Sequence, residues 1–390
     1  FKKNDITKKI YLEEKAVKKN GGQIKFTSGI TFSSSALINK YFDSFTDQQK
    51  FFLNSIKKKH SFNSISKNID NISSKEVLII GETIIDQYVF CEPLGKSGKD
   101  SFLTFREINS EKYFGGVISV SNHLSDFCKK INLFTMIGNI NSYEKEIKNN
   151  LSKNIILNKI VKKNSNTIIK KRYLDYLNKN KIFGAYDIND NTIDKKSETL
   201  CIEKLNKLRK KVDSVIILDY GHGFITEKIA KFILKNFKFV SVNAQINSAN
   251  IGLHSLQKYF KPNLILINEN ELRFELKNKR ENIKTLMKKL VLLYKCTFLI
   301  VTMGDKGCIL YDKKSKKFRE CPAFANKVVD KVGAGDTMIS LTSFLLSNKL
   351  DNNLSLLFGS IAASKAVESL GNSVSVNKID IMKKIENVLK

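Results

Sequence analysis

Short runs of consecutive apolar residues constrain the fold of this chain more than any other feature of its sequence. The clearest runs occupy residues 215–218, 264–267 and 298–301. Each run has the length and continuity of a parallel strand that is buried on both faces. Helical patterns lie between them, at residues 226–236 and 282–294. Because strands that alternate with helices form a sheet covered on both sides, the sequence predicts an α/β fold with three layers.

Polar residues follow or end the apolar runs, which places them together at one edge of the predicted sheet. These residues are Glu82, Asp219, Asn268, Thr302 and Asp330. In open α/β sheets, ligands bind in the crevice at the carboxyl ends of the strands. We therefore expect the functional site of this chain at that edge.

A glycine-rich turn with an acidic residue beside it lies near the C-terminal end of the chain. Residues 330–337 read Asp-Lys-Val-Gly-Ala-Gly-Asp-Thr and lead into a helical pattern. The backbone N–H groups of such a turn and the N-terminus of the helix converge on one point, where phosphate charge is stabilised. A carboxylate there repels phosphate, so Asp336 needs another reason to be present. One reason is that Asp336 is the base that takes the proton from an attacking hydroxyl group.

Other interpretations of this turn are open from the octapeptide alone. Asp336 fits a helix N-cap, and glycine before a helix is ordinary turn chemistry. A P-loop is excluded because no Lys-Ser/Thr pair follows the glycines. The dinucleotide-binding fingerprint is excluded because its third glycine would fall at Met338.

Residues 330–337 resemble the C-terminal signature of the ribokinase / phosphofructokinase-B family of carbohydrate kinases, with Lys331 where that signature usually has Thr. Four further segments match the family in the expected order: residues 77–86, Gly115-Gly116 followed by Asn122, residues 268–271 and residues 301–307. The resemblance implies a ribokinase-like three-layer α/β/α sandwich over residues 76–390, with a small β lid formed by residues 87–114 and 167–186. It also implies an ATP-dependent, magnesium-requiring kinase that acts on a small-molecule sugar or sugar phosphate, and a homodimer that forms through the lid.

The resemblance further implies roles for individual residues. The residues implied to bind the sugar are Asp86, Gly115, Gly116, Asn122 and, from the lid, Arg172. The residues implied to lie at the nucleotide are Asn268, Glu271, Thr302, Gly304 and Gly307, with Glu271 tied to the magnesium ion. The catalytic set implied is the base Asp336 with Gly333, Ala334 and Gly335, which hold the phosphate charge.

Several of these segments also fit a purely structural role. Asn268 and Glu271 have the spacing of a helix capping box. Residues 302–307 fit a tight hairpin turn, and the basic run at residues 170–172 fits a solvated face. His222 follows a predicted strand, and a contact with a bound phosphate is one interpretation of its position. A structural role is favoured for it, because Asp336 already supplies the base.

Residues 167–172, 219–223 and 240–250 resemble the heptose-phosphate kinase half of bifunctional ADP-heptose synthesis proteins. This resemblance implies that the acceptor is a heptose phosphate or a related sugar that is later activated with a nucleotide. The competing hypothesis is a non-catalytic sugar- or nucleotide-binding module of a multidomain protein. The intact Gly-Ala-Gly-Asp sequence argues against it, since a kinase that has lost its activity does not need the base.

Residues 1–75 differ in character from the rest of the chain. Residues 21–26 and 31–35 resemble the C-terminal end of a nucleotidyltransferase domain that some kinases of this family carry. No His-x-Gly-His-type element accompanies them, and the chain begins at Phe1 rather than Met, so a catalytic part is expected upstream. Residues 57–74 are rich in Lys, Ser and Asn, which predicts a linker. We expect residues 1–75 to contribute nothing to catalysis.

The formal charge of +29 raises the possibility of nucleic-acid binding, but only six of the 67 basic residues are arginine. Base and phosphate recognition favours the bidentate arginine fork, so no specific nucleic acid is expected as a partner. The six cysteines and four histidines form no cluster with zinc-ligand spacing. Unclustered cysteines without a signal peptide predict a cytoplasmic protein. No apolar run approaches the roughly 18 residues of a membrane span.

Overall fold

A long mixed sheet forms the centre of the molecule, with the strand order β12-β11-β10-β9-β8-β7-β1-β3-β4. The structure is a computed structural model that describes residues 10–24, 45–253, 255–371 and 375–389. The sheet strands are β1 (Glu76–Lys96), β3 (Lys130–Ile140), β4 (Ile155–Asn166), β7 (Ser214–Asp219), β8 (Val240–Ala244), β9 (Leu264–Asn268), β10 (Phe298–Thr302), β11 (Cys308–Asp312) and β12 (Lys317–Cys321). Strands β4 to β10 along this order pair in parallel, and β11 and β12 close the edge as antiparallel strands.

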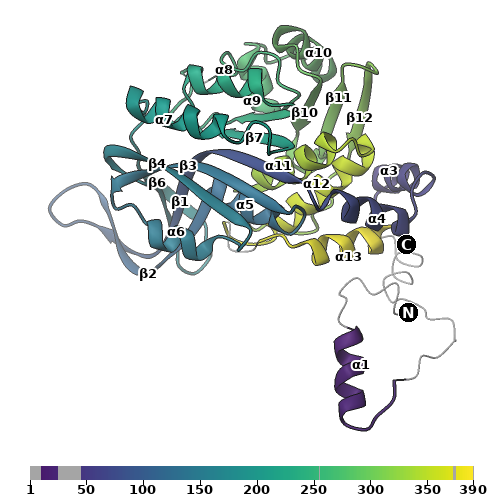
Figure 1. The fold of residues 1–390 in the computed structure, drawn as a ribbon. Helices are drawn as coiled ribbons and strands as arrows, with labels where there is room; N and C mark the ends of the chain where they lie inside the picture. Colours follow the sequence, from purple (N-terminus) through teal and green to yellow (C-terminus); the bar gives the residue numbers. More distant parts are fainter. Residues whose placement is uncertain (1–9, 25–44, 254, 372–374, 390) are drawn as a thin grey trace.

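Helices cover both faces of this sheet. On one face lie α7 (Lys195–Asn206), α8 (Glu227–Asn236), α9 (Glu269–Glu275) and α10 (Ile283–Tyr294) (Figure 1). On the other lie α5 (Val117–Ser125), α11 (Ala334–Ser347), α12 (Asn352–Val367) and α13 (Lys378–Val388), and α6 (Glu144–Asn150) precedes β4 (Figure 1). Every residue of β7 is buried, as expected of a strand covered on both faces. The predicted three-layer α/β architecture is confirmed.

A small β lid extends from one edge of the sandwich, as predicted. Its strands are the distal half of β1, together with β2 (Leu103–Gly116), β5 (Ile168–Asp175) and β6 (Lys181–Asp187). Strand β1 pairs with β3 and β7 up to Glu82, and from Thr83 onward it pairs with β2 and β5. One continuous strand therefore carries the chain from the central sheet into the lid (Figure 1).

Two helices before β1 pack onto the sandwich, which corrects the expectation of a linker at residues 57–74. They are α3 (Asp47–Lys57) and α4 (Phe62–Ile72). Ile65, Ile69 and Ile72 of α4 are buried in the main core, and Ser61 caps the helix by accepting a hydrogen bond from the Ser64 N–H. The three isoleucines recur at spacings of four and three, so they share one face of the helix. The surrounding Lys, Ser and Asn residues are its solvated face.

Helix α1 (Ile10–Lys19) has no buried residue and lies apart from the sandwich in Figure 1. Most of the two segments that resemble a nucleotidyltransferase lies outside the described residues, since residues 25–44 are not among them. Within the part of the chain that the structure describes, no helix is long and apolar enough to cross a membrane.

Candidate active site

A cavity of about 1220 Å³ opens at the carboxyl ends of the parallel strands, the edge where the site was expected. The expected site residues that line this cavity are Asp86, Gly116, Arg172, Asn268, Glu271, Thr302, Gly304, Gly307, Gly333, Ala334, Gly335 and Asp336. Residues that are far apart in the sequence, such as Asp86 on β1 and Asp336 on α11, thus meet around one cavity.

The glycine turn and Asp336 line this cavity, and Asp336 is bonded to Tyr220, which follows β7 in the middle of the sheet. Gly333 precedes the first residue of α11 with a φ of 84°, a left-handed conformation that favours glycine. The cap residue of this helix is Gly333, which has no side chain to bond the first turn, and Asp336 lies inside that turn. The alternative that Asp336 is the N-cap of the helix is therefore wrong.

The Asp336 carboxyl group is 9% exposed, and its Oδ1 accepts a hydrogen bond of 2.9 Å from the Tyr220 hydroxyl. Burial raises the pKa of Asp336 to about 6, and the nearby charge of Asp86 adds to this effect. The Tyr220 hydrogen bond and the charge of Lys170 act in the opposite direction and lower the pKa. A carboxyl group with a pKa near 6 is ionised at neutral pH and is a stronger base than an ordinary aspartate.

Tyr220 was not among the expected site residues, and a buried carboxylate holds the loop that carries it. Glu82 is fully buried and accepts hydrogen bonds from the backbone N–H groups of Tyr220 (3.0 Å), His222 (3.3 Å) and Phe224 (3.3 Å). Burial, with the charge of Asp219, raises the pKa of Glu82 to about 7. The position of Tyr220 directly after a strand that ends at the rim was the signal in the sequence that pointed to it.

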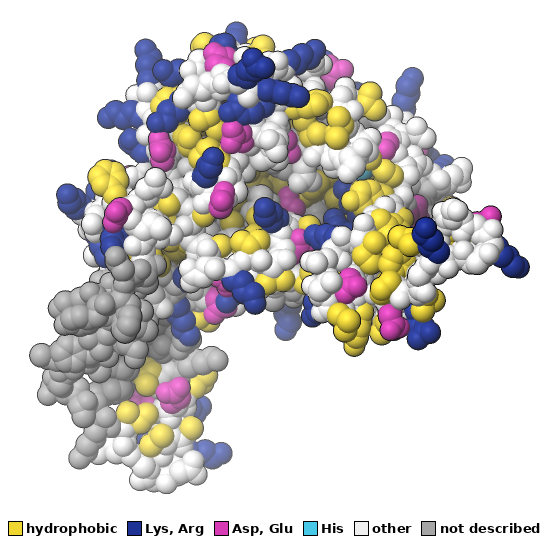
Figure 2. Space-filling model, turned by 180° about the vertical axis from the view of Figure 1, so that it is seen from behind, with side chains coloured by type: hydrophobic (Ala, Val, Ile, Leu, Met, Phe, Trp, Pro, Cys, Tyr) yellow, Lys and Arg dark blue, Asp and Glu magenta, His cyan; other side chains and the backbone are white. Residues whose placement is uncertain are grey.

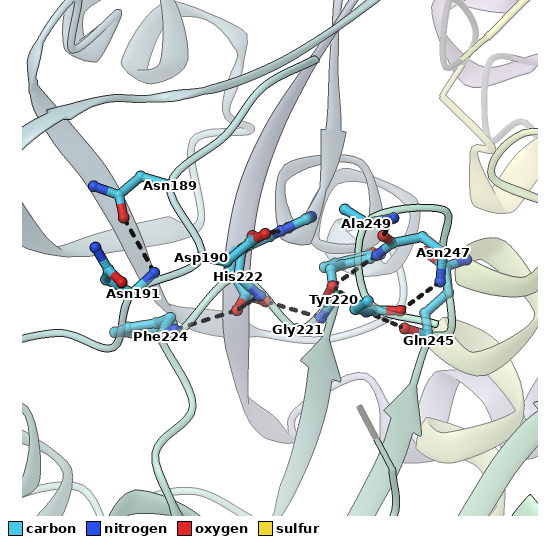
Figure 3. Close-up of polar contacts among 12 residues, drawn as sticks. Asn189, Asp190, Asn191, Tyr220, Gly221, His222, Phe224, Gln245, Asn247 and Ala249 are labelled. Carbon is cyan, nitrogen blue, oxygen red and sulfur yellow. Dashed lines mark hydrogen bonds and ion pairs between the residues drawn. The ribbon is translucent and has the colours of Figure 1, made fainter. Parts of the chain in front are cut away.

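Figure 3 shows this loop between two neighbouring segments. On one side the His222 Nδ1 lies 2.7 Å from Asp190 Oδ1, and on the other the side-chain amide of Asn247 donates to the Tyr220 carbonyl oxygen at 2.8 Å. The His222 side chain is fully buried, and the residue is not part of the cavity wall. A structural role for His222, the interpretation favoured from the sequence, agrees with this placement.

The end of the cavity under the lid contains both acidic and basic side chains. Arg172 forms a short ion pair with Asp86, and both side chains are largely buried. Lys170 lies two residues before Arg172 on β5, on the same face of the strand, and is 6% exposed. Burial, the largest influence, lowers the pKa of Lys170. The spacing of two residues between Lys170 and Arg172 in a β-type pattern was the sequence signal that could have placed Lys170 on the same face as Arg172. The interpretation of residues 170–172 as a solvated face is wrong for both of these residues.

The structure does not bring all the expected sugar-binding residues to the cavity. Gly116 lines it with a φ of 59°, and a Cβ atom there would lie 2.5 Å from the Glu82 carbonyl oxygen. Gly115 is not part of the cavity wall. Asn122 is turned to the loop after α6, where its amide donates to the Asn150 carbonyl oxygen at 2.9 Å and accepts from the Ser152 N–H at 3.1 Å.

Asn268 and Glu271 line the cavity and also form the capping box that their spacing allowed. The Asn268 side chain accepts from the Glu271 N–H at 2.9 Å, and Glu271 Oε2 accepts from the Asn268 N–H at 2.8 Å. Glu271 Oε1 accepts from the Ile246 N–H at 3.0 Å. Burial raises the pKa of Glu271 to about 7. Each oxygen keeps lone pairs, so the capping role leaves the carboxylate able to bind a hydrated cation.

Within the described residues, no group of three or more His, Cys, Asp or Glu side chains could hold a metal ion. Mg²⁺ usually keeps several waters and is bound by one or two carboxylates together with substrate phosphates. Asn268 and Glu271 fit that mode of binding and do not form a cage made of protein alone.

The far end of the cavity contains the turn between β10 and β11. Thr302, Gly304 and Gly307 line it, and β10 and β11 are antiparallel, so this segment is a hairpin turn as well as part of the wall. Gly307 has a φ of 82°, and a Cβ atom there would lie 2.1 Å from the Cys321 carbonyl oxygen. Only glycine fits this close approach of two backbone segments.

Asp330 connects the glycine turn to the lid. Its carboxylate accepts hydrogen bonds from the Tyr88 hydroxyl and the Lys181 ammonium group, both at 2.7 Å and both from lid strands. It also accepts from the N–H groups of Val332 and Gly371, each at 3.2 Å. Although burial acts to raise the pKa of Asp330, the bonds from Lys181 and Tyr88 hold it below its usual value. Asp330 is therefore ionised at the junction between the lid and the turn.

Known proteins similar to this chain are carbohydrate kinases and a bifunctional protein. The bifunctional protein HldE of Campylobacter jejuni is 24% identical over 316 residues, which are 80% of this chain and 65% of that protein. HldE of Aliarcobacter butzleri is 27% identical over 316 residues, 77% of this chain and 62% of that protein. The chain thus spans a little under two thirds of the length of these relatives.

Solved structures with the same fold include Arabidopsis thaliana ribokinase complexed with ribose and ATP, with a TM-score of 0.61 at 17% identity over 81% of this chain and 99% of that one. Thermotoga maritima ribokinase superposes with a TM-score of 0.59 at 18% identity over 80% of this chain and 99% of that one. These likenesses show that the fold is ribokinase-like.

The family model described as pfkB family carbohydrate kinase matches residues 74–379. The match contains the central sheet, the lid and the whole cavity wall except the residues contributed by α3 and the residue before it. The chain belongs to the pfkB family of carbohydrate kinases.

Proposed function

We propose that this chain transfers the γ-phosphoryl group of ATP to a hydroxyl group of a sugar phosphate, with a heptose phosphate as the acceptor. The observation that carries the proposal is the position of Asp336. Its buried carboxylate lies beside the glycine turn, in a cavity whose lid end carries Asp86, Lys170 and Arg172. This arrangement places a base between a site for phosphate charge and a site for a polar acceptor.

In the proposed reaction, Asp336 takes the proton of the attacking hydroxyl as its oxygen bonds to the γ-phosphorus. The bond between the γ-phosphorus and the bridging oxygen breaks, and ADP leaves. The N–H groups of the turn at Gly333, Ala334 and Gly335 stabilise the charge on the transferred group. Positioning and electrostatic stabilisation account for most of the rate in reactions of this class.

Magnesium is part of the proposal, and Asn268 and Glu271 are the residues that would hold it through its waters. The ion would neutralise the negative charge of the nucleotide phosphates. Thr302, Gly304 and Gly307 form the part of the cavity wall that would lie at the nucleotide itself.

The choice of a phosphorylated acceptor rests on charge and on the relatives. Lys170 and Arg172 place two cationic groups under the lid, and among the described residues only Arg172 is ion-paired with a carboxylate there. A phosphate group on the acceptor would balance the second charge. The similarity to HldE supports a heptose phosphate, at 24–27% identity in the two relatives described above.

Release of ADP over a panel of sugars and sugar phosphates tests the proposal, with Asp336→Asn as the matched control. We expect turnover with a phosphorylated heptose and none above background with the unphosphorylated sugar. If the protein binds ATP and turns over no acceptor in the panel, the chain is a non-catalytic binding module instead.

Three further parts of the proposal concern the whole protein. We propose a homodimer through the lid, supported by the exposed apolar side chains Leu94, Phe102, Leu103, Leu177 and Phe183 on the lid strands and the turns between them.

We propose a cytoplasmic location, supported by six cysteines that are all free and buried. We also propose that residues 1–75 begin with the C-terminal remnant of a nucleotidyltransferase-like domain, on the resemblance of residues 21–26 and 31–35 alone.

A further inference from the structure

Helix α3 contributes to the wall of the active-site cavity, although it precedes the residues that match the family model. Thr46, Gln48 and Gln49 line the cavity, whereas the match to the family begins at residue 74. This part of the wall therefore lies outside the residues that match the family model.

The helix is fastened to the loop that follows β12. Gln49 closes the capping box of α3, since its Oε1 accepts from the Thr46 N–H at 2.9 Å and its own N–H donates to Thr46 Oγ1 at 3.3 Å. The same side chain donates through Nε2 to the Ala323 carbonyl oxygen at 2.6 Å. One turn further along, the buried ring of Phe52 lies 6.4 Å from the ring of Phe324. Gln49 thus joins the helix cap to the loop that carries Phe324.

The position of α3 identifies which part of a nucleotide it faces. The acceptor end of the cavity holds Asp86 and Arg172, from β1 and the lid, whereas residues 302–307 follow β10, three strands beyond β7 in the sheet. Asp336, beside the glycine turn, is bonded to Tyr220, which follows β7 between these two ends. Because the γ-phosphate must lie between the turn and the acceptor, the base of the nucleotide lies at the far end. There the wall combines apolar side chains such as Met303 and Phe324 with the three residues contributed by the start of α3.

A base site of this kind has apolar walls and a few polar groups that fix the orientation of the ligand. Gln48 is exposed and lines the cavity, and its side chain makes no hydrogen bond within the described part of the chain. Its amide offers both donors and an acceptor, the combination that the edge of an adenine base requires.

We propose that α3 forms one wall of the nucleotide base site, in which Gln48 hydrogen-bonds the edge of the base and Gln49 positions the loop of Phe324. This inference rests on the proposed function, since it takes the nucleotide to be the substrate of this cavity. Because the Gln48 amide carries both donors and an acceptor, it can pair with the edge of adenine or of guanine, so it contributes to the affinity for the base and not to the choice between ATP and GTP.

The test is calorimetric titration of the full chain with ATP and with GTP, without any acceptor, on the parent and three variants. Gln48→Ala removes the amide. Gln49→Glu keeps the capping box, since glutamate accepts from the Thr46 N–H, but loses the donor to Ala323 and places a carboxylate against its carbonyl oxygen. Asn54→Ala changes an exposed residue of the same helix away from the cavity and is the matched control.

A neutral hydrogen bond contributes about 0.5–1.5 kcal/mol, so we expect Gln48→Ala to raise the Kd of ATP about threefold to tenfold. We expect a similar effect on GTP, a rise in the Kd of ATP for Gln49→Glu, and parental values for Asn54→Ala. The inference is overturned if both glutamine variants bind ATP like the parent and melt at the same temperature. A parent that binds no ATP would instead contradict the proposed function, so the two failures are distinguishable.

Discussion

Asp336 combines the two properties that a general base in a phosphoryl-transfer site needs. It lies in the cavity beside the glycine turn, and its pKa of about 6 leaves it ionised at neutral pH. General-base catalysis typically contributes about 10²–10⁴-fold to a rate. Asparagine keeps the shape of the side chain and its ability to accept from Tyr220.

We therefore expect Asp336→Asn to lower turnover at least about 100-fold, with an unchanged melting temperature and unchanged ATP affinity. Turnover, thermal melting and nucleotide titration on one preparation check this. A variant that melts like the parent and keeps more than about a tenth of its turnover would show that Asp336 is not the base.

The Tyr220 hydroxyl gives this base a measurable signature in the pH profile. The base works only when it has lost its proton, so kcat/KM should fall as the pH drops through about 6, the pKa of Asp336. The hydrogen bond from Tyr220 lowers that pKa, and its removal in Tyr220→Phe should raise it. We expect the acidic limb of the profile to move to higher pH in this variant. A profile measured between about pH 5 and 9 that overlays the parent would contradict this role of Tyr220.

Helix α4 contributes to the core although the sequence predicted a linker at its position. Ile69 is fully buried in the main core, so the cavity left by Ile69→Ala should lower the free energy of unfolding by about 2–5 kcal/mol. The midpoint of urea unfolding, at an unchanged slope, measures this loss. Asn68→Ala, an exposed neighbour on the same helix, is the matched control and should stay near the parent value. Equal midpoints for the two variants would mean that residues 62–72 behave as a linker after all.

The contacts between the lid and Asp330 also lead to a testable prediction. Lys181 and Tyr88 attach the lid to Asp330, next to the glycine turn, so lid closure and the shape of the turn are linked. Lys181→Met removes the ion pair, and we expect a KM for the acceptor that is several-fold higher with little change in ATP affinity. Lys171→Met, on the neighbouring lid strand, is the control because its ammonium makes no ion pair with the described residues. Equal acceptor KM values for the two variants would show that the Asp330 contact does not hold the lid.

For the molecule as a whole, the strong positive charge is the property most open to misinterpretation. Lysine and arginine side chains are spread over the face in Figure 2, with acidic side chains among them. Spread lysines attract any polyanion through counterion release and read no sequence. We expect binding to DNA or RNA to be independent of sequence and largely lost by about 200 mM salt. Fluorescence anisotropy with two unrelated oligonucleotides checks this, and tight selective binding at that salt would contradict it.

The strands and the glycine turn could be predicted from the sequence because each depends on neighbouring residues, whereas the lid was predicted from the resemblance to the family. A buried parallel strand needs a continuous apolar run, and the turn needs glycine where φ is positive, as at Gly333. Helix α4 was missed because its three isoleucines are a minority among polar residues, and only the core they pack into distinguishes them from a linker.

The sequence alone thus determined the fold class, and twelve of the fourteen site residues predicted from it line the cavity. Tertiary structure decided which partner each polar side chain has. Tyr220 bonds Asp336, Gln49 bonds Ala323, and Asn122 bonds Asn150 and so lies away from the cavity. These pairs are separated by 28 to 274 positions in the chain. Local patterns contain no information about such distances, because the partner of a polar side chain is set by the packing of whole elements around it.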